Sequence, residues 1–190
     1  MNYLVLLDRD GTINTHVGLV TKPEQLVLLP NAAKAIKLLN DHNIFVAIIT
    51  NQSIVARNLC TEAEAEAINQ HLVDMLAKYG AKIDAIYYCP HHPEKNHPEA
   101  NSSFYRINCD CRKPKPGMLV KAAKHFRIAP ENCFMVGDST RDMLAGKNFG
   151  CKTILLRTGE GGKDGKYHVL PDYTSDNLYE AAKLIVNLIK

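Results

Sequence analysis

Short runs of apolar residues alternate along the chain with longer stretches in which apolar residues recur every three or four positions. Short apolar, often β-branched runs are typical of buried strands, and the three-to-four spacing is typical of amphipathic helices. The pattern predicts strands over residues 3–7, 44–49, 85–88, 133–136 and 152–156, and helices over residues 31–40, 61–79, 117–126, 139–149 and 175–189.

The predicted elements come in the order strand then helix, repeated about five times. This alternation argues for a parallel sheet with helices on both faces, and nearly continuous apolar strands suit a sheet buried on both sides. We therefore predict an α/β fold with a doubly wound parallel sheet, in a single domain over residues 1–190. Two stretches lack the alternation: His91–Pro116, and Arg157–Tyr173, which contains four glycines and which we expect to be a mobile surface loop.

Composition narrows the class of protein further. With 46% hydrophobic and 23% charged residues, the chain is not of the disordered kind, and a net charge of +3 is too small to argue for nucleic-acid or membrane partners. No apolar run approaches the roughly 18–20 residues of a membrane helix, and the N-terminal run meets Asp8 too soon for a signal peptide. We expect a monomeric cytoplasmic protein.

Acidic residues follow two of the predicted strands, at the edge where ligands bind in parallel sheets. Asp8 and Asp10 leave the first strand, while Asp138 and Asp142 follow the strand over 133–136. Asp followed by Gly is also an ordinary turn after a strand, but the matching carboxylates at a second strand end disfavour that reading. Three converging carboxylates would repel one another without a cation, and oxygen ligands suit Mg²⁺.

Hydrogen-bond donors and cations are expected at the same edge. Thr50 follows the second strand, where its hydroxyl could donate to an anionic oxygen or simply cap a helix. The segment Arg112-Lys113-Pro114-Lys115-Pro116 places three cations before a predicted helix, and its prolines restrict the backbone, which disfavours a solvated basic turn. Cations that face carboxylates and Mg²⁺ are what a phosphoryl group requires.

These residues resemble the motifs of the haloacid dehalogenase (HAD) superfamily of phosphohydrolases, through most of the chain from about residue 5 to 158. A narrower resemblance is to the D-glycero-D-manno-heptose 1,7-bisphosphate phosphatases and the related histidinol phosphatase domains. The matching strings are Asp8-Arg-Asp-Gly-Thr-Ile-Asn14, Thr50-Asn-Gln-Ser53, Tyr87-Tyr-Cys-Pro-His-His-Pro93, Cys109-Asp-Cys-Arg-Lys-Pro-Lys-Pro-Gly-Met118 and Gly137-Asp-x-x-x-Asp142.

The resemblance implies a HAD-like fold without a large cap domain, and a mechanism through an aspartyl-phosphate. Asp8 would be the nucleophile, and Asp10 would protonate the leaving oxygen and later deprotonate the attacking water. Mg²⁺ would be held by Asp8, the main-chain carbonyl of Asp10, and Asp138. Asp142 would orient Lys113 or the surroundings of the metal.

The same resemblance implies a substrate site for a sugar phosphate. Thr50 and Lys113 would hold the phosphoryl oxygens, the neighbouring Asn51 and Gln52 belong to the same motif, and Arg112 would reach the rest of the substrate. The chain departs from the heptose pattern at Val17, Leu19, Ile54, Asn58 and Ser139, all of which we expect near the part of the substrate that is not transferred.

The remaining motif is a loop over about 89–111 that is rich in cysteine and histidine. Cys89-x-His91 and Cys109-x-Cys111 supply three thiols and an imidazole, the complete set of a structural zinc site. The alternatives are unbound thiols, a disulfide, or His92 in place of His91, which the resemblance favours. Cys60, Cys133 and Cys151 are scattered and are expected to be core thiols.

The leading hypothesis is therefore a Mg²⁺-dependent phosphatase that removes the C7 phosphate of D-glycero-D-manno-heptose 1,7-bisphosphate. Histidinol-phosphate phosphatase is the alternative within the superfamily, disfavoured by the double histidine of the loop. A non-catalytic, zinc-stabilised binding module is the alternative of another class. Release of phosphate from a panel of substrates would separate the three.

Overall fold

The strands form one parallel sheet in the order β3-β2-β1-β4-β5-β6. The computed structural model describes residues 2–93 and 104–190, so the middle of the predicted zinc loop lies outside the described residues. The doubly wound parallel sheet predicted from the apolar pattern is confirmed. The strands are β1 (Leu4–Leu7), β2 (Phe45–Asn51), β3 (Ala85–Cys89), β4 (Cys133–Gly137), β5 (Lys152–Leu156) and β6 (Tyr173–Ser175).

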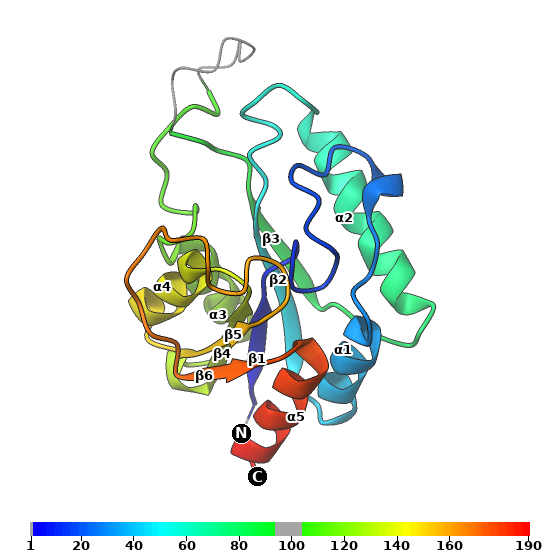
Figure 1. Cartoon of the computed structure of the whole chain (residues 1–190), viewed down its shortest axis with the longest axis vertical. Helices are drawn as coiled ribbons and strands as arrows, with labels where there is room; N and C mark the ends of the chain where they lie inside the picture. The colour runs from blue at the N-terminus through cyan, green and yellow to red at the C-terminus, as the bar shows by residue number, and fades with distance from the viewer. Residues whose placement is uncertain (1, 94–103) are drawn as a thin grey trace.

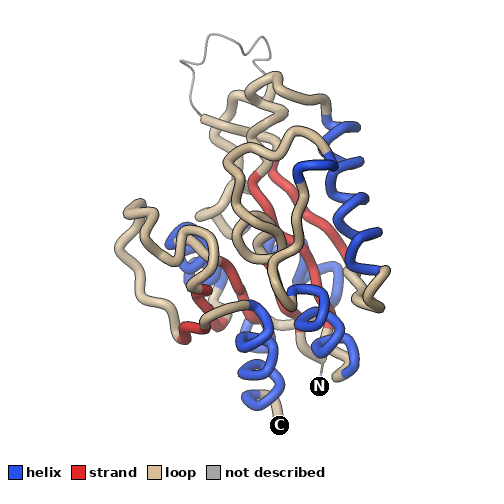
Figure 2. Tube along the Cα trace, turned by 45° about the vertical axis from the view of Figure 1, so that its right-hand side comes forward, coloured by secondary structure: helices blue, strands red, loops and turns tan. Residues whose placement is uncertain are grey.

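Helices cover both faces of the sheet, as Figures 1 and 2 show. Alternate residues of each strand point to opposite faces, so Val5 and Leu7 of β1 join one buried cluster while Leu4 and Leu6 join the other. The first cluster is covered by α1 (Ala32–Asp41), α2 (Glu62–Ala77) and α5 (Leu178–Leu188), and the second by α3 (Gly117–Phe126) and α4 (Thr140–Phe149).

The order of the strands creates a crevice at one end of the sheet. β1 lies between β2 and β4, and the helices that follow β1 and β4 pack on opposite faces, so the two loops part as they leave the sheet. The register pairs Leu7 with Val136, which brings Asp8 and Asp138 to neighbouring positions just beyond the strands. The fold thus gathers the predicted acidic residues at one point.

One predicted helix needs correction near the C-terminus, and one strand there was not predicted. Ser175, expected to begin the last helix, belongs to β6, and α5 begins only at Leu178 after Asn177, whose side chain accepts the N–H groups of Tyr179 and Glu180. β6 has three residues, which is too short to show a periodicity. It lies at the edge of the sheet, beside β5.

The stretch from Arg157 to the start of β6 is also more than a surface loop. Thr158 donates its hydroxyl to the carbonyl of Gly11, and Gly162 donates its N–H to the carbonyl of Asp138. These bonds hold the glycine-rich segment against the loops that follow β1 and β4. None of the helices within residues 2–93 and 104–190 is long and apolar enough to cross a membrane.

Candidate active site

Asp8, Lys113 and Asp142 form a buried chain of charges at the crevice. The ammonium of Lys113 lies 2.7 Å from Asp8 Oδ1 and 2.6 Å from Asp142 Oδ1, and it also donates to the carbonyl of Ile49 at 2.7 Å. All three N–H donors of Lys113 are therefore engaged. Burial lowers the pKa of Lys113, but the charges of Asp142 and Asp8 outweigh this effect and raise it. Lys113 is a fixed positive charge beside Asp8.

Two carboxylate oxygens in the crevice are left open for a ligand. Both oxygens of Asp142 have a neighbour, because Oδ1 lies against the ammonium of Lys113 and Oδ2 accepts the hydroxyl and the N–H of Ser139. Asp138 Oδ2 accepts the N–H of Glu160 at 2.7 Å. Within the described residues, no hydrogen bond reaches Asp8 Oδ2 or Asp138 Oδ1. The site thus offers two hard oxygen ligands from adjacent strands, which suits a small divalent cation.

The pKa values of these two carboxyl groups indicate an excess of negative charge. Burial raises the pKa of Asp8 to about 6, against the opposing effect of Lys113. Burial, and then the charges of Asp8 and Asp142, raise the pKa of Asp138 to about 8. Lys113 and the nearby Arg141 together do not neutralise three buried carboxylates, and a cation between Asp8 and Asp138 would complete the balance.

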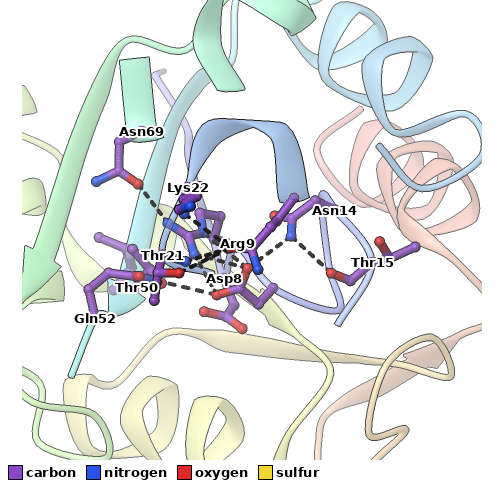
Figure 3. A network of polar contacts seen from close by, with 12 residues as sticks. Asp8, Arg9, Asn14, Thr15, Thr21, Lys22, Thr50, Gln52 and Asn69 are labelled. Atoms are coloured by element: carbon purple, nitrogen blue, oxygen red, sulfur yellow. Dashed lines mark hydrogen bonds and ion pairs between the residues drawn. The ribbon is translucent and has the colours of Figure 1, made fainter. Parts of the chain in front are cut away.

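Asp10 is held in place by its neighbours rather than by the sheet. The buried Arg9 grips it with two nitrogens, of which Nη2 lies 2.8 Å from Asp10 Oδ2, and Arg9 is itself anchored to Asn69 of α2 at 2.9 Å. Asn14 donates to Asp10 Oδ1 at 2.8 Å. Figure 3 shows Arg9 between Asn69 on one side and Asn14 on the other. The carboxyl of Asp10 still lines the cavity beside Asp8.

The three polar residues at the end of β2 have different surroundings. Thr50 and Asn51 line the cavity, and Asn51 forms a reciprocal pair of 3.1 Å hydrogen bonds with the main chain of Lys113. Gln52 is buried, and it donates to the Thr50 hydroxyl at 2.8 Å and to Asp10 at 3.4 Å. Gln52 is not among the residues that line the cavity, and its side chain lies next to Thr50 (Figure 3).

Asp138 lies between two glycines from different loops. A Cβ atom built on Gly11 would come within 2.1 Å of Asp138 Oδ2, and one built on Gly159 within 1.9 Å. Both glycines have positive φ, 84° and 56°, in the left-handed region that glycine adopts most readily. The position of Asp138 therefore depends on the absence of a side chain at Gly159. This glycine belongs to the segment that the sequence pattern predicts to be a surface loop.

We expect Gly159→Ala to weaken metal binding at Asp138 by about tenfold or more, because the new methyl group must displace the carboxylate. Gly165→Ala is the matched control, since Gly165 has a similar φ of 61° but open space around it. The measurement is the Mg²⁺ concentration that gives half-maximal activity. An equal change in both variants would attribute the effect to backbone strain and not to Asp138.

The cavity around these residues contains charged groups that the sequence pattern did not single out. Arg141 from the first turn of α4, and Glu160 and Lys166 from the glycine-rich segment, line it together with Arg112. A charged residue in a helix or in a loop carries no signal by itself, so only the fold could place these residues. The complete lining is Asp8, Asp10, His16, Gly18, Leu19, Thr50, Asn51, Ser53, Arg112, Lys113, Asp138, Arg141, Glu160 and Lys166.

Of the departures from the heptose pattern, only Leu19 lines the cavity, and Val17 lies beside lining residues in the same segment. Ile54, Asn58 and Ser139 are not among the lining residues, so their expected place near the substrate stays a prediction. Ile54 is part of the core, and Ser139 forms a capping box at the start of α4. Asn58 has a φ of 56°, and asparagine tolerates this left-handed region better than other non-glycine residues.

The predicted zinc ligands converge on one point after β3. The Sγ atoms of Cys89, Cys109 and Cys111 lie 3.1 to 3.5 Å apart without a disulfide, and His91 Nδ1 lies 3.3 Å from Cys111 Sγ. His92 is not part of this group. Three thiols and one imidazole fit a closed tetrahedral zinc site. The other three cysteines are free thiols outside it; Cys133 and Cys151 are buried, and Cys60 is partly buried.

The cluster is joined directly to the cavity through Arg112. This residue follows Cys111 in the chain, and its Nη1 donates to the carbonyl of His91 at 3.0 Å. The guanidinium that lines the cavity is therefore fixed by the main chain of a cluster residue. A change in the geometry of the cluster would change the position of this cation.

A parallel sheet in this strand order, with a buried aspartate–lysine pair and two open carboxylate oxygens at its switch point, is the arrangement of a HAD-like phosphatase. A family model described as HAD-hydrolase-like matches residues 110–181. The chain is 38% identical over 190 residues to the D-glycero-β-D-manno-heptose-1,7-bisphosphate 7-phosphatase of Pasteurella multocida, covering 99% of each chain. It is 35% identical to the corresponding enzyme of Chlorobaculum tepidum, covering 94% and 91%.

A solved structure agrees with these relatives. The D,D-heptose 1,7-bisphosphate phosphatase of B. bronchiseptica, complexed with magnesium and phosphate, superposes with a TM-score of 0.85 at 33% identity, covering 98% of this chain and 99% of that one. The chain belongs to the family of the D-glycero-D-manno-heptose-1,7-bisphosphate 7-phosphatases, and it is a phosphatase.

Proposed function

We propose that this protein removes the C7 phosphate of D-glycero-D-manno-heptose 1,7-bisphosphate with the help of Mg²⁺. The observation that carries the proposal is the pairing of Asp8 with Lys113 beside the open oxygens of Asp8 and Asp138. The heptose bisphosphate is the substrate in the names of the relatives in Pasteurella multocida and Chlorobaculum tepidum. The same relatives give no support to the histidinol-phosphate alternative.

In the first step, a carboxylate oxygen of Asp8 attacks phosphorus, and the bond from phosphorus to the sugar oxygen breaks. Lys113 holds Asp8 in orientation and balances the negative charge that collects at the phosphoryl group. Asp10 gives its proton to the departing sugar oxygen, so the sugar leaves as a neutral alcohol. Arg9 and Asn14 hold the Asp10 carboxyl beside the reacting atoms.

In the second step, water hydrolyses the phosphate ester formed on Asp8. Asp10, now deprotonated, takes a proton from the attacking water, the bond from Asp8 to phosphorus breaks, and inorganic phosphate leaves. Thr50, which lines the cavity, would donate its hydroxyl to a phosphoryl oxygen, as would the main-chain N–H groups that follow Asp8. Gln52 orients the Thr50 hydroxyl from behind.

Two metals are part of the proposal. Mg²⁺, held by Asp8, Asp138 and the main-chain carbonyl of Asp10, would shield the attacking carboxylate from the phosphoryl charge. Zn²⁺, held by Cys89, His91, Cys109 and Cys111, would order the loop that carries Arg112. A single domain over residues 1–190, a monomeric state and a cytoplasmic location stay predictions.

The test is release of phosphate from heptose 1,7-bisphosphate, histidinol phosphate and a panel of other sugar phosphates. We expect the heptose bisphosphate to give the highest kcat/KM. Mild EDTA should abolish activity and added Mg²⁺ should restore it, while zinc stays bound, because Mg²⁺ sites that retain water exchange readily. Release from histidinol phosphate alone would contradict the substrate, and no release from any compound would favour the binding module.

A further inference from the structure

Arg141 presents a guanidinium to the active-site cavity without any partner for its donors. Its Nε atom is buried and has no hydrogen-bond partner. Within residues 2–93 and 104–190, no hydrogen bond or ion pair to any of its nitrogens is found. Buried donors are nearly always paired, and those of arginine are planar and suited to a two-oxygen acceptor. The side chain is built for an acceptor that comes with the ligand.

Arg141 has a second cation beside it in the cavity. Arg112 and Arg141 both line this cavity, so two guanidinium groups face the same enclosed space. Arg112 keeps its place through the bond to the carbonyl of His91. Two like charges held next to each other are unfavourable unless an anion lies between them.

The charges around the transferred phosphoryl group do not need Arg141. Lys113 and the cation expected between Asp8 and Asp138 already face that group, and Asp10 is paired with Arg9. Arg112, Arg141 and the exposed Lys166 add three positive charges to the cavity lining, beside the carboxylates of Asp8, Asp10, Asp138 and Glu160. The unpartnered donors of Arg141 in this lining suit a second anionic group on the substrate. The buried, unpartnered Oε2 of Glu160 suits a sugar hydroxyl.

We propose that Arg141 is a specificity-determining residue that binds, together with Arg112, a second phosphate of the substrate, the one that is not transferred. This inference rests on the phosphatase function proposed above and deepens it by assigning the bisphosphate preference to a residue of α4. The guanidinium of Arg141 would donate two charge-assisted hydrogen bonds to that phosphate.

The experiment compares Arg141→Met and Arg141→Lys with the wild type on two substrates. One is heptose 1,7-bisphosphate, and the other is 4-nitrophenyl phosphate, which has no second anionic group. The readout is the ratio of the two kcat/KM values. Methionine and lysine are good helix formers, so α4 should be kept, and thermal unfolding checks this. Arg157→Met is the matched control, because Arg157 is 68% exposed and lies outside the cavity.

We expect Arg141→Met to lower the ratio of kcat/KM for the bisphosphate to kcat/KM for 4-nitrophenyl phosphate by about 10- to 100-fold. The loss should come mainly from a higher KM for the bisphosphate, because the variant loses hydrogen bonds to a charged group. Arg141→Lys should recover part of it, because the charge remains but the planar fork is lost. Arg157→Met should keep the wild-type ratio. An unchanged ratio in Arg141→Met, or an equal loss on both substrates, would overturn the proposal.

Failure of the proposed function would be visible in the wild type alone. The wild type would then hydrolyse 4-nitrophenyl phosphate but not the heptose bisphosphate. In that case, the ratio of kcat/KM values is measured for Arg141→Met with the sugar bisphosphate that the wild type prefers in place of the heptose bisphosphate. A loss of kcat/KM on that bisphosphate, without a loss on 4-nitrophenyl phosphate, supports the role of Arg141. If the wild type hydrolyses no sugar bisphosphate with a higher kcat/KM than a sugar monophosphate, the proposed role of Arg141 is overturned as well.

Discussion

Replacing Asp8 by asparagine is expected to lower kcat by about 1,000-fold or more while the fold is kept. The amide has nearly the same shape as the carboxylate, but it is neutral and a poor nucleophile. Lys113 keeps an oxygen to donate to at position 8, and its ion pair with Asp142 at 2.6 Å remains. The buried ammonium is therefore not left without a charge partner, which is why asparagine is a better choice than alanine.

Single-turnover measurement of phosphate release gives the loss, and thermal unfolding gives the state of the fold. Asp41→Asn is the matched control, because Asp41 pairs with Lys37 at the exposed end of α1 and lies outside the cavity. It should retain wild-type activity. If Asp8→Asn kept more than a tenth of wild-type activity, Asp8 could not be the nucleophile.

Removing one cluster thiol by Cys111→Ser should release zinc and lower kcat/KM by about 100-fold. Metal binding at such a site is largely ordering free energy, so the segment that carries the ligands loses its fixed geometry. Arg112 loses the fixed carbonyl of His91, and Lys113 follows Arg112 directly. A misplacement of about 1 Å in a substrate-positioning group can cost on the order of 100-fold in rate. Circular dichroism should show the sheet intact.

Cys60→Ser is the control for the loss of a thiol, because Cys60 is a free cysteine outside the cluster. Elemental analysis should find zinc in this control and in the wild type but not in Cys111→Ser. A zinc-free Cys111→Ser protein that binds and hydrolyses the substrate as well as wild type would separate the cluster from catalysis. Arg112 would then be positioned by other contacts.

The apolar pattern predicts the five longer strands and the five helices because each buries a face that its sequence must make apolar. The pattern does not predict β6, because Tyr173–Ser175 is only three residues long and contains polar residues. It also lies at the edge of the sheet. The helix bounds differ by a few residues where caps decide them, as at Asn177 before α5.

For the site, residue type and strand ends were enough to predict that Asp8 and Asp138 meet, because parallel strands bring their carboxyl ends to one edge. Lys113 follows no strand, and it was predicted from its basic segment and from the family resemblance. The place of Gly159 could not be predicted, since its importance lies in a carboxylate that approaches from another loop. Arg141 was missed for a related reason: a charged residue in the first turn of a helix is usually solvated, and only the packing of the neighbouring loops puts it in the cavity.

The buried set of three carboxylates and one lysine also has a kinetic consequence. Before a cation enters, a phosphate ester that arrives alone meets the negative charge of Asp8 in a medium of low polarity, while Asp138, whose pKa burial and the charges of Asp8 and Asp142 raise to about 8, holds a proton at neutral pH. Once a divalent cation lies between these carboxylates, the repulsion is gone and the same ester is attracted. We therefore expect binding to be ordered, with the metal entering first or together with the sugar phosphate, and not after it.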